Sequence, residues 1–319
     1  MRRYALCVAT LLFAALTAVA QLVAPNPSRH KPSVAPLLKT TWAQGKPFNE
    51  QCPTKKDKDD VERHCPVGCV ALALAQIMKY YNYPEMGQGS KTYKPLLGGG
   101  ELSANFGETK YLWDRMRDNY FSLGSYRNYS DEEADAVSTL CFHVGVSVGM
   151  MYQLSGSSAF AYSNIPRDMV ENFRYDGEKI RYLKRADYTK EQWMDLIFTE
   201  LSEGRPIFYS GNSPSQGGHA WVVDGYNATG EVHINWGWRG KSDGYFDIDL
   251  SMGDNNYSQQ QSMVIGIMPP KNSMGLNTTT SLRRVKAIYG LDGRALPQMR
   301  KGVNIVKYMD GTTRKVVVR

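Results

Sequence analysis

The stretch Pro66-Val67-Gly68-Cys69-Val70-Ala71 runs directly into an apolar segment that extends to residue 83. Residues 69–83 are apolar on almost every side, which predicts a central buried helix that ends before Pro84. A cysteine at the start of a helix lies at the positive end of the helix dipole, where backbone N–H groups stabilise a thiolate. The stretch therefore predicts a reactive cysteine at the N-terminus of a buried helix.

Two motifs far downstream supply candidate partners for this thiol. In Gly217-Gly218-His219-Ala220-Trp221 the histidine lies 150 residues beyond Cys69, and Ile234-Asn235-Trp236-Gly237-Trp238 follows this motif. A turn at 227–230 separates two predicted strands, so His219 and Asn235 should lie within about three positions of each other in an antiparallel pair. Amide cleavage by a thiol needs a nucleophile, a base and a group that orients the base. Cys, His and Asn in this order predict a cysteine protease.

Further side chains near these motifs fit the same chemistry. Gln44, in Trp42-Ala43-Gln44-Gly45, is the best-placed side-chain amide to join the backbone N–H of Cys69 in stabilising an oxyanion. Trp236 and Trp238 are placed to shield a His219–Asn235 hydrogen bond from water. His233, inside the second strand, is the rival of His219 for the role of base.

The charge distribution argues against a nucleic-acid-binding protein. The chain has 319 residues, of which 42% are hydrophobic, and a formal net charge of +7. Residues 281–319 contain ten Lys or Arg and two Asp or Glu, a net charge of +8, which leaves about −1 for the preceding 280 residues. We therefore expect no basic face that holds phosphates on the main part of the chain.

The first twenty residues have the pattern of a signal peptide. Arg2 and Arg3 precede an apolar run at 5–18, and Ala18-Val19-Ala20 is a small-residue cleavage site. The run is too short for a comfortable membrane span, and no later segment approaches 18 apolar residues. We expect a secreted or cell-surface protein without a membrane span.

Four cysteines follow the predicted cleavage site: Cys52, Cys65, Cys69 and Cys141. Two disulfides are the simplest interpretation in an oxidising compartment. We favour a free Cys69, a buried Cys141 and a possible Cys52–Cys65 bridge. Zinc held by Cys52, His64, Cys65 and Cys69 is an alternative, although paired C-x-x-C knuckles are missing. We expect neither a metal nor a cofactor.

The pattern of predicted elements changes halfway along the chain. Further helices are predicted at 131–148, 165–173 and 190–203, the first with Ser130 and Glu133 as a capping box and the last ended by Gly204. Strands are predicted at 206–210, 220–226, 231–235, 244–250 and 263–268. A helix-rich half followed by an antiparallel β-rich half indicates the α+β class.

Several motifs in fixed order closely resemble the streptopain (streptococcal pyrogenic exotoxin B) family of cysteine peptidases, in particular its interpain and PrtT-type members from Gram-negative anaerobes. These motifs lie at 42–49, 68–71, 75–80, 83–84, 217–220, 235–238 and 242–246. The resemblance covers roughly residues 37–269. It implies a papain-like fold and an endopeptidase that acts on proteins or peptides and favours a hydrophobic residue at P2, the second position before the scissile bond.

The resemblance also implies roles for individual residues. Cys69 matches the nucleophile, His219 the general base, Gln44 the oxyanion-hole donor, and Asn235 with Trp236 the pair that orients the histidine. The Gly- and Ser-rich loop at 155–159 matches the loop beside the P2 pocket. Expected substrate-binding residues are Ser157, Ser158, Ala159, Gly218, Trp236 and Trp238.

Five regions are expected along the chain: a signal peptide at 1–20, a linker or short pro-segment at 21–39, a papain-like peptidase domain at 40–270, a linker at 271–282 and a β-rich tail at 283–319. Members of the resembled family usually carry a long inhibitory prodomain, which has no counterpart in the short segment here. Residues 288–294 and 302–306 resemble the sorting domain of type IX secretion cargo, which implies secretion machinery as a partner.

Two other functions remain open from the sequence. One is a Cys–His amidase or murein hydrolase, which uses the same dyad on a smaller related core. The other is a non-catalytic adhesin built on a peptidase fold. Gln44 and the Asn235–Trp236 pair favour the peptidase, and a binding module has no need of a free thiol facing a histidine.

Overall fold

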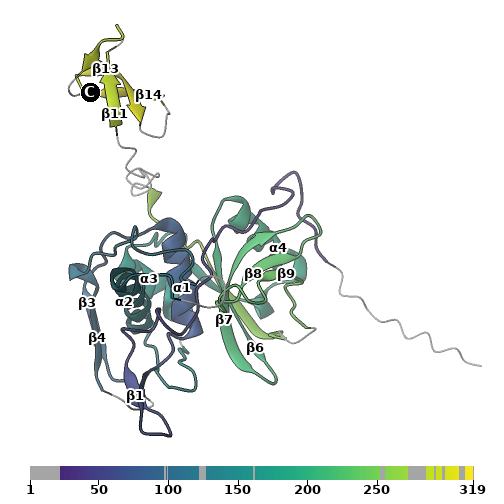
Figure 1. Ribbon diagram of the computed structural model, residues 1–319. Helices are drawn as coiled ribbons and strands as arrows, with labels where there is room; N and C mark the ends of the chain where they lie inside the picture. Colours follow the sequence, from purple (N-terminus) through teal and green to yellow (C-terminus); the bar gives the residue numbers. More distant parts are fainter. Residues whose placement is uncertain are drawn as a thin grey trace, which may run out of the picture. The chain divides into compact units, whose positions relative to one another are not determined.

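The computed structural model describes residues 22–319 apart from 97, 99, 122–126, 161, 252–255, 272–284, 291, 297–298, 309–312 and 319. The chain divides into two compact units, Met1–Pro269 and Pro270–Arg319 (Figure 1). The predicted signal peptide, which contains Cys7, lies outside the described residues. No helix among the described residues is long and apolar enough to cross a membrane.

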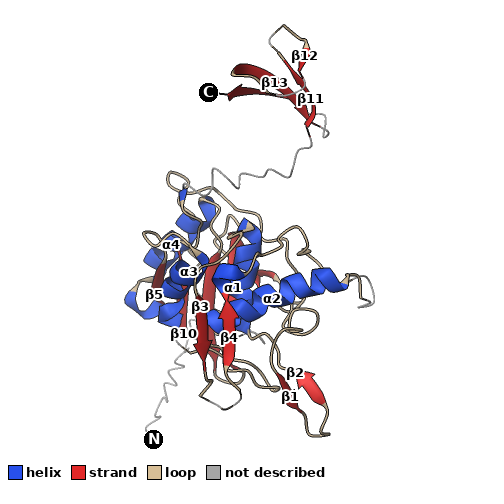
Figure 2. Cartoon of the chain, turned by 90° about the vertical axis from the view of Figure 1, so that its left-hand side faces the viewer, coloured by secondary structure: helices blue, strands red, loops and turns tan. Residues whose placement is uncertain are grey.

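The first half of the larger unit contains three α-helices among its described residues (Figure 2). Its helices are α1 (Cys69–Tyr81), α2 (Asp131–Ser147) and α3 (Ile165–Phe173). Two hairpins flank them, β1 (Thr54–Lys56) with β2 (Glu62–His64), and β3 (Ser90–Tyr93) with β4 (Leu102–Asn105). Short 3₁₀ turns are η1 (Phe106–Glu108), η2 (Tyr162–Asn164) and η3 (Arg185–Asp187).

The second half is built on a six-stranded antiparallel sheet in the order β5-β10-β6-β7-β8-β9. Its strands are β5 (Arg181–Lys184), β6 (Ile207–Ser213), β7 (Gly217–Tyr226), β8 (Val232–Asn235), β9 (Gly244–Phe246) and β10 (Gln259–Ile265). Helix α4 (Lys190–Ser202) covers one face of this sheet. This mixture of helices and antiparallel sheet confirms the predicted α+β class.

Successive side chains of β7 point alternately into two hydrophobic cores, one on each face of the sheet. Ala220 and Val222 belong to the hydrophobic core that contains α1, whereas Trp221 and Val223 belong to the core beneath α4. This is the period-two pattern of a strand buried on both faces. The sheet is thus clamped between α1 on one face and α4 on the other.

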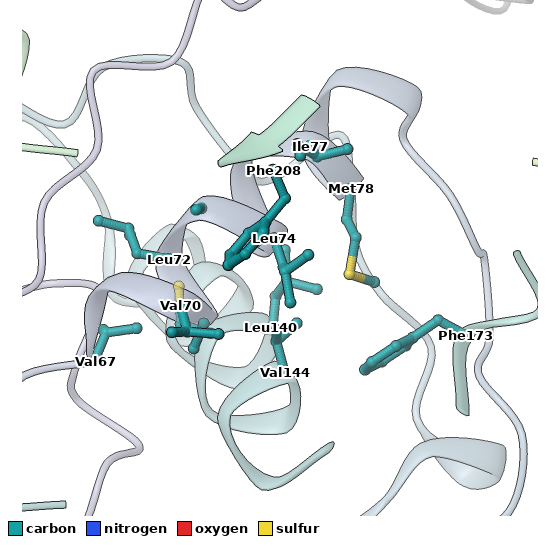
Figure 3. Close-up of a cluster of buried hydrophobic side chains, with 14 of the residues drawn as sticks. Val67, Val70, Leu72, Leu74, Ile77, Met78, Leu140, Val144, Phe173 and Phe208 are labelled. Atoms are coloured by element: carbon teal, nitrogen blue, oxygen red, sulfur yellow. The ribbon is translucent and has the colours of Figure 1, made fainter. Parts of the chain in front are cut away.

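Helix α1 is the centre of the larger core. Every residue from Val70 to Met78 is buried, as the nearly continuous apolar sequence predicts. In Figure 3 the side chain of Leu74 lies between Phe208 of β6 and Leu140 with Val144 of α2. The helix that carries Cys69 is therefore fixed by packing on opposite sides.

The predicted helices agree closely with the observed ones. Helix α2 has the predicted capping box, because the Ser130 side chain accepts from Glu133 N and the Glu133 side chain accepts from Ser130 N. Helix α4 ends one residue earlier than predicted, before Gly204, which has φ +76°. The short strand β5 was not predicted, because Arg181–Lys184 is mostly polar and shows no alternation of the kind that marks a strand.

Residues 22–38, expected to be a linker or short pro-segment, lie packed against the sheet. Val34 exchanges backbone hydrogen bonds of 2.8 and 2.9 Å with Tyr226 of β7, and Leu37 N donates to Asp224 O. Leu38 N donates to the Asp224 carboxylate, which is fully buried. We call residues 22–38 the N-terminal arm, and these contacts make it part of the folded larger unit.

The smaller unit is a four-stranded antiparallel sheet in the order β12-β11-β13-β14. Its strands are β11 (Val285–Tyr289), β12 (Ala295–Leu296), β13 (Gly302–Tyr308) and β14 (Thr313–Val318). The buried Asn304 side chain donates to Arg300 O and accepts from Arg300 N, which closes the loop before β13. Asp310-Gly311, a residue pair that predicts a turn in this tail, lies outside the described residues.

The arm predicts a position-specific effect of an added methyl group. A Cβ atom at Gly225 would lie 2.8 Å from Val34 O and 3.1 Å from Pro36 N, so Gly225→Ala must push the arm away from β7. We expect a loss of about 1–3 kcal/mol in the free energy of unfolding, measured by urea denaturation. The control is Gly244→Ala in β9, where the nearest atom is 3.8 Å away. Equal stability of the two variants would show that the arm does not contribute.

Candidate active site

Cys69 is placed by the glycine that precedes it. Gly68 is the N-cap of α1 and has φ 89° and ψ 137°, a conformation that side chains disfavour. A Cβ atom there would lie 2.7 Å from Met150 Sδ and 3.0 Å from Ser157 O. Glycine is therefore required at this position both for backbone conformation and for space.

The thiol of Cys69 lies between the start of α1 and strand β7. The backbone N–H groups of Ala220, Val70 and Cys69 itself lie close enough to the sulfur to lower the pKa of the thiol. Burial acts more strongly in the opposite direction and raises the pKa of the Cys69 thiol above its ordinary value of 9.0. The contact with Ala220 brings the sulfur to the residue directly after His219.

His219 is held by a backbone carbonyl and by aromatic rings. Its Nε2 atom lies 3.0 Å from Trp236 O, and its ring stacks on Trp238 with the centroids 5.0 Å apart. Trp221 and Trp236 stack on the ring at 6.0 Å each. Burial lowers the pKa of His219 to about 4. Because Nε2 is engaged by Trp236, Nδ1 is the ring nitrogen left for proton exchange.

Asn235 lies where the predicted register placed it but makes different hydrogen bonds. Its partner across the β7–β8 pair is Val222, three positions from His219. Its Oδ1 accepts from Gly237 N at 3.1 Å and from Gln76 Nε2 at 3.2 Å, and its Nδ2 donates to Thr40 O at 2.8 Å. The acceptor for His219 is thus the Trp236 carbonyl instead of the Asn235 side chain.

Gln44 lies beside the segment that leads into α1. The backbone carbonyl oxygen of Gln44 accepts from Val67 N at 2.9 Å, and Val67 lies two residues before Cys69. It also lines a hollow of about 410 Å³ together with Ala43, Gly237, Trp238, Arg239 and Lys241. Gln44 and Trp238 therefore border one open side of the site.

A larger cavity of about 910 Å³ opens on another side of Cys69. Four of the expected substrate-binding residues line it, Ser157, Ser158, Ala159 and Gly218. The Ser157 hydroxyl donates to Pro66 O at 2.6 Å and so ties the loop at 155–159 to the start of α1. Trp236 differs from the expectation, because it is 1% exposed and packs behind His219, where substrate does not reach it.

Other residues considered for the site lie elsewhere. His233 pairs with the buried Asp224 carboxylate, with 2.6 Å between Nδ1 and Oδ1. Cys52, Cys65 and Cys141 are free and buried, so the possible Cys52–Cys65 bridge is not formed in the structure. Among the described residues, no group of three or more His, Cys, Asp or Glu side chains could hold a metal ion.

Several residues around the thiol and the histidine were not predicted from the sequence. Tyr162 and Tyr257 both lie near enough to Cys69 for a thiolate there to raise their pKa values. The Tyr257 ring also lies 5.5 Å from the His219 ring, between centroids, and Tyr182 lines the larger cavity. Their positions depend on how loops and the edge strand β5 fold back, which local patterns do not show. Gln76 is the single amide side chain in the apolar helix α1, and a lone amide there could have indicated a buried hydrogen-bonding role.

Comparisons with known proteins agree with this geometry. A model of the Peptidase C10 family matches residues 42–246. The chain is 38% identical over 266 residues to the thiol protease/hemagglutinin PrtT of Porphyromonas gingivalis, covering 77% of this chain and 29% of that protein. It is 35% identical over 249 residues to streptopain of Streptococcus pyogenes, covering 72% and 60%.

Among solved structures, active interpain A cysteine protease of Prevotella intermedia superposes with a TM-score of 0.69 at 41% identity, covering 77% of this chain and 99% of that one. The papain-like fold expected from the resemblance is therefore the observed fold. The chain spans well under two thirds of the length of PrtT and 60% of streptopain. By sequence and by structure, the chain belongs to the Peptidase C10 family.

Proposed function

We propose that this chain is a secreted cysteine endopeptidase that cleaves peptide bonds through Cys69 and His219. The observation that carries the proposal is the joint placement of the two groups. Cys69 and Gly218, the neighbour of His219, line the same cavity, and the Ala220 N–H on the other side of His219 lies close enough to the sulfur to lower the thiol pKa. The His219 ring is fixed by Trp236 O at Nε2, so that Nδ1 is the nitrogen available to the thiol. The names of two similar proteins, the thiol protease/hemagglutinin PrtT and the interpain A cysteine protease, support the same activity.

The buried site favours charge on both groups together over charge on either alone. Burial raises the pKa of the Cys69 thiol and lowers that of the His219 imidazole, so an isolated thiolate or imidazolium is disfavoured. Transfer of the proton from sulfur to Nδ1 creates two opposite charges in contact, and each then stabilises the other. We therefore expect the pair to react as a thiolate and an imidazolium.

The reaction then follows from the groups around the pair. The thiolate attacks the scissile carbonyl and forms a C–S bond, while the backbone N–H of Cys69 and the Gln44 amide stabilise the oxyanion. The imidazolium gives its proton to the departing amine as the C–N bond breaks, leaving an acyl-enzyme. Neutral His219 next takes a proton from water, whose attack releases the acid and restores the thiol.

The larger cavity supports a preference for a hydrophobic residue at P2. Val70, Ala159, Tyr162 and Tyr182 contribute apolar surface to its lining beside Cys69. Lys184 and Arg185 lie on the same lining and disfavour a basic side chain there. We therefore expect leucine at P2 to be accepted much better than lysine.

Substitution of the nucleophile tests the activity. Cys69→Ala should lose casein hydrolysis by a factor on the order of 10³ or more, because no other group can form the acyl-enzyme. Circular dichroism of Cys69→Ala should match the wild type.

A pair of peptides tests the P2 preference. The wild type should cleave a peptide with leucine at P2 at least about 10-fold faster, in kcat/KM, than the same peptide with lysine at P2.

A matched pair of histidine variants separates the proposed base from its rival. His219→Gln should lose activity almost as far as Cys69→Ala, while His233→Gln, which keeps a donor for Asp224, should retain it. Cleavage of peptidoglycan without casein would favour a murein hydrolase. Absence of any turnover, with no iodoacetamide adduct on Cys69 in the folded wild type, would favour the adhesin.

The acid limb of the pH profile follows from the burial of His219. When the Cys69 thiol and the His219 imidazolium are both protonated, the pair loses its first proton at a pH no higher than the pKa of His219. Burial lowers that pKa to about 4. Below that pH neither group can accept the proton of the other, so activity falls as pH decreases. We expect kcat/KM for peptide cleavage to have its acid midpoint below about pH 5.5. A midpoint at the ordinary imidazole value of about 6.5 would contradict this assignment.

We also propose that the protein is exported through its N-terminal signal and that the β-rich unit at 270–319 serves secretion. Support comes from the pattern of residues 1–20 and from the resemblance of residues 288–294 and 302–306 to sorting domains. Intact-mass spectrometry of protein recovered from the culture medium should find an N-terminus near Gln21. Protein that remains in the cells with Arg2 and Arg3 still attached would contradict export.

A further inference from the structure

We propose that Gln76 of α1 is a positioning residue for His219, acting through Asn235 and the peptide bond between Trp236 and Gly237. The inference deepens the proposed peptidase function and rests on it. Gln76 is 1% exposed and is the only polar residue among the nine buried residues from Val70 to Met78. It lies seven residues beyond Cys69, close to two helical turns, and therefore on nearly the same side of α1.

The peptide unit that holds His219 is itself held at its N–H group. Trp236 O accepts from His219 Nε2, and the N–H of the same peptide unit, on Gly237, donates to Asn235 Oδ1 at 3.1 Å. Rotation of this peptide would break both bonds at once. The tilt of the imidazole therefore depends on where the Asn235 amide is held.

Three buried groups hold the Asn235 amide in one orientation. Asn235 Nδ2 donates to Thr40 O, so Oδ1 faces Gly237 N and Gln76 Nε2. The Thr40 hydroxyl donates to Gln76 Oε1 at 2.8 Å, which turns Gln76 Nε2 toward Asn235. Thr40 and Asn235 are each 4% exposed, so water does not compete for these bonds.

Direct packing reinforces the same link between α1 and the loop. Gly237 has φ 73°, and a Cβ atom there would lie 2.8 Å from Leu72 Cδ2 and 3.9 Å from Gln76 Nε2. The loop backbone thus rests against α1 between Leu72 and Gln76. One helix therefore sets the position of the thiol at its first residue and the position of the base through its eighth.

Two nearly isosteric substitutions test the role of the Gln76 amide. Gln76→Met removes the donor, and Gln76→Glu places an acceptor against Asn235 Oδ1. We expect kcat to fall about 10- to 100-fold in Gln76→Met and further in Gln76→Glu, because small displacements of a catalytic group are costly. KM should change less than about threefold, since Gln76 does not line either cavity.

A control variant in α2 separates positioning from general destabilisation. Ser147 is 1% exposed and accepts from Asn172 Nδ2 at 2.9 Å, so Ser147→Ala removes a partly buried hydrogen bond away from the site. That variant should keep the wild-type kcat at a temperature where both variants are folded. The double variant Gln76→Met/Asn235→Ala should be no slower than Asn235→Ala alone, because the two residues act in series.

The outcomes distinguish this inference from the function on which it rests. An inactive wild type would remove the proposed function. An active wild type with an unchanged kcat in Gln76→Met would overturn the positioning role alone. Two further results would also overturn it. One is an equal loss of kcat in Gln76→Met and Ser147→Ala. The other is a double variant whose loss of kcat is the product of the losses in Gln76→Met and Asn235→Ala.

Discussion

The burial of α1 between α2 and the antiparallel sheet is the constraint on which the rest of the site depends. A helix packed on opposite sides cannot shift along its axis without opening cavities in both cores, each of which costs free energy. Its first residue, Cys69, is therefore fixed relative to β7, and Ala220 N can meet the sulfur. Gly68 completes the constraint, because its conformation and its contact with Met150 exclude any side chain.

The aromatic surroundings of His219 give the site its electrostatic character. Trp221, Trp236 and Trp238 remove water from the ring without adding a charge that would stabilise imidazolium. The imidazole is consequently a poor acceptor of a proton from bulk solvent, which is why burial lowers its pKa to about 4. In the proposed mechanism a proton from Cys69 is different, since its departure leaves a thiolate as counter-charge. That mechanism thereby links protonation of His219 to ionisation of Cys69.

Much of the fold could be predicted because its patterns are local. The apolar run after Cys69, the capping box at Ser130 and Glu133, and the turn at 227–230 each depend on neighbouring residues. The strand β5 and the N-terminal arm could not be predicted in the same way. The Val34–Tyr226 pairing joins segments that are far apart in the chain, and the proline-rich composition of residues 22–38 predicts a linker instead of a paired segment. At the site, the residues Cys69, His219 and Asn235 were identifiable by type and order, and their register followed from the hairpin. The hydrogen-bond acceptor for His219 was not identifiable, because every residue has a backbone carbonyl and residue types do not show which one is used.

The use of a backbone carbonyl in place of a side-chain amide changes what the neighbouring residues must do. A side-chain amide orients a histidine by itself, but a carbonyl can do so only if its peptide unit is prevented from turning. Here Asn235 holds the N–H of that unit, and Asp243 Oδ1 accepts from Trp236 N at 2.9 Å on the preceding one. Asn235 thus contributes to orientation at one remove, and its own amide needs the partners Gln76 and Thr40 to stay in place. The groups that hold His219 thus form a buried network that ends on the same helix as Cys69, so the thiol and the imidazole are both positioned by α1.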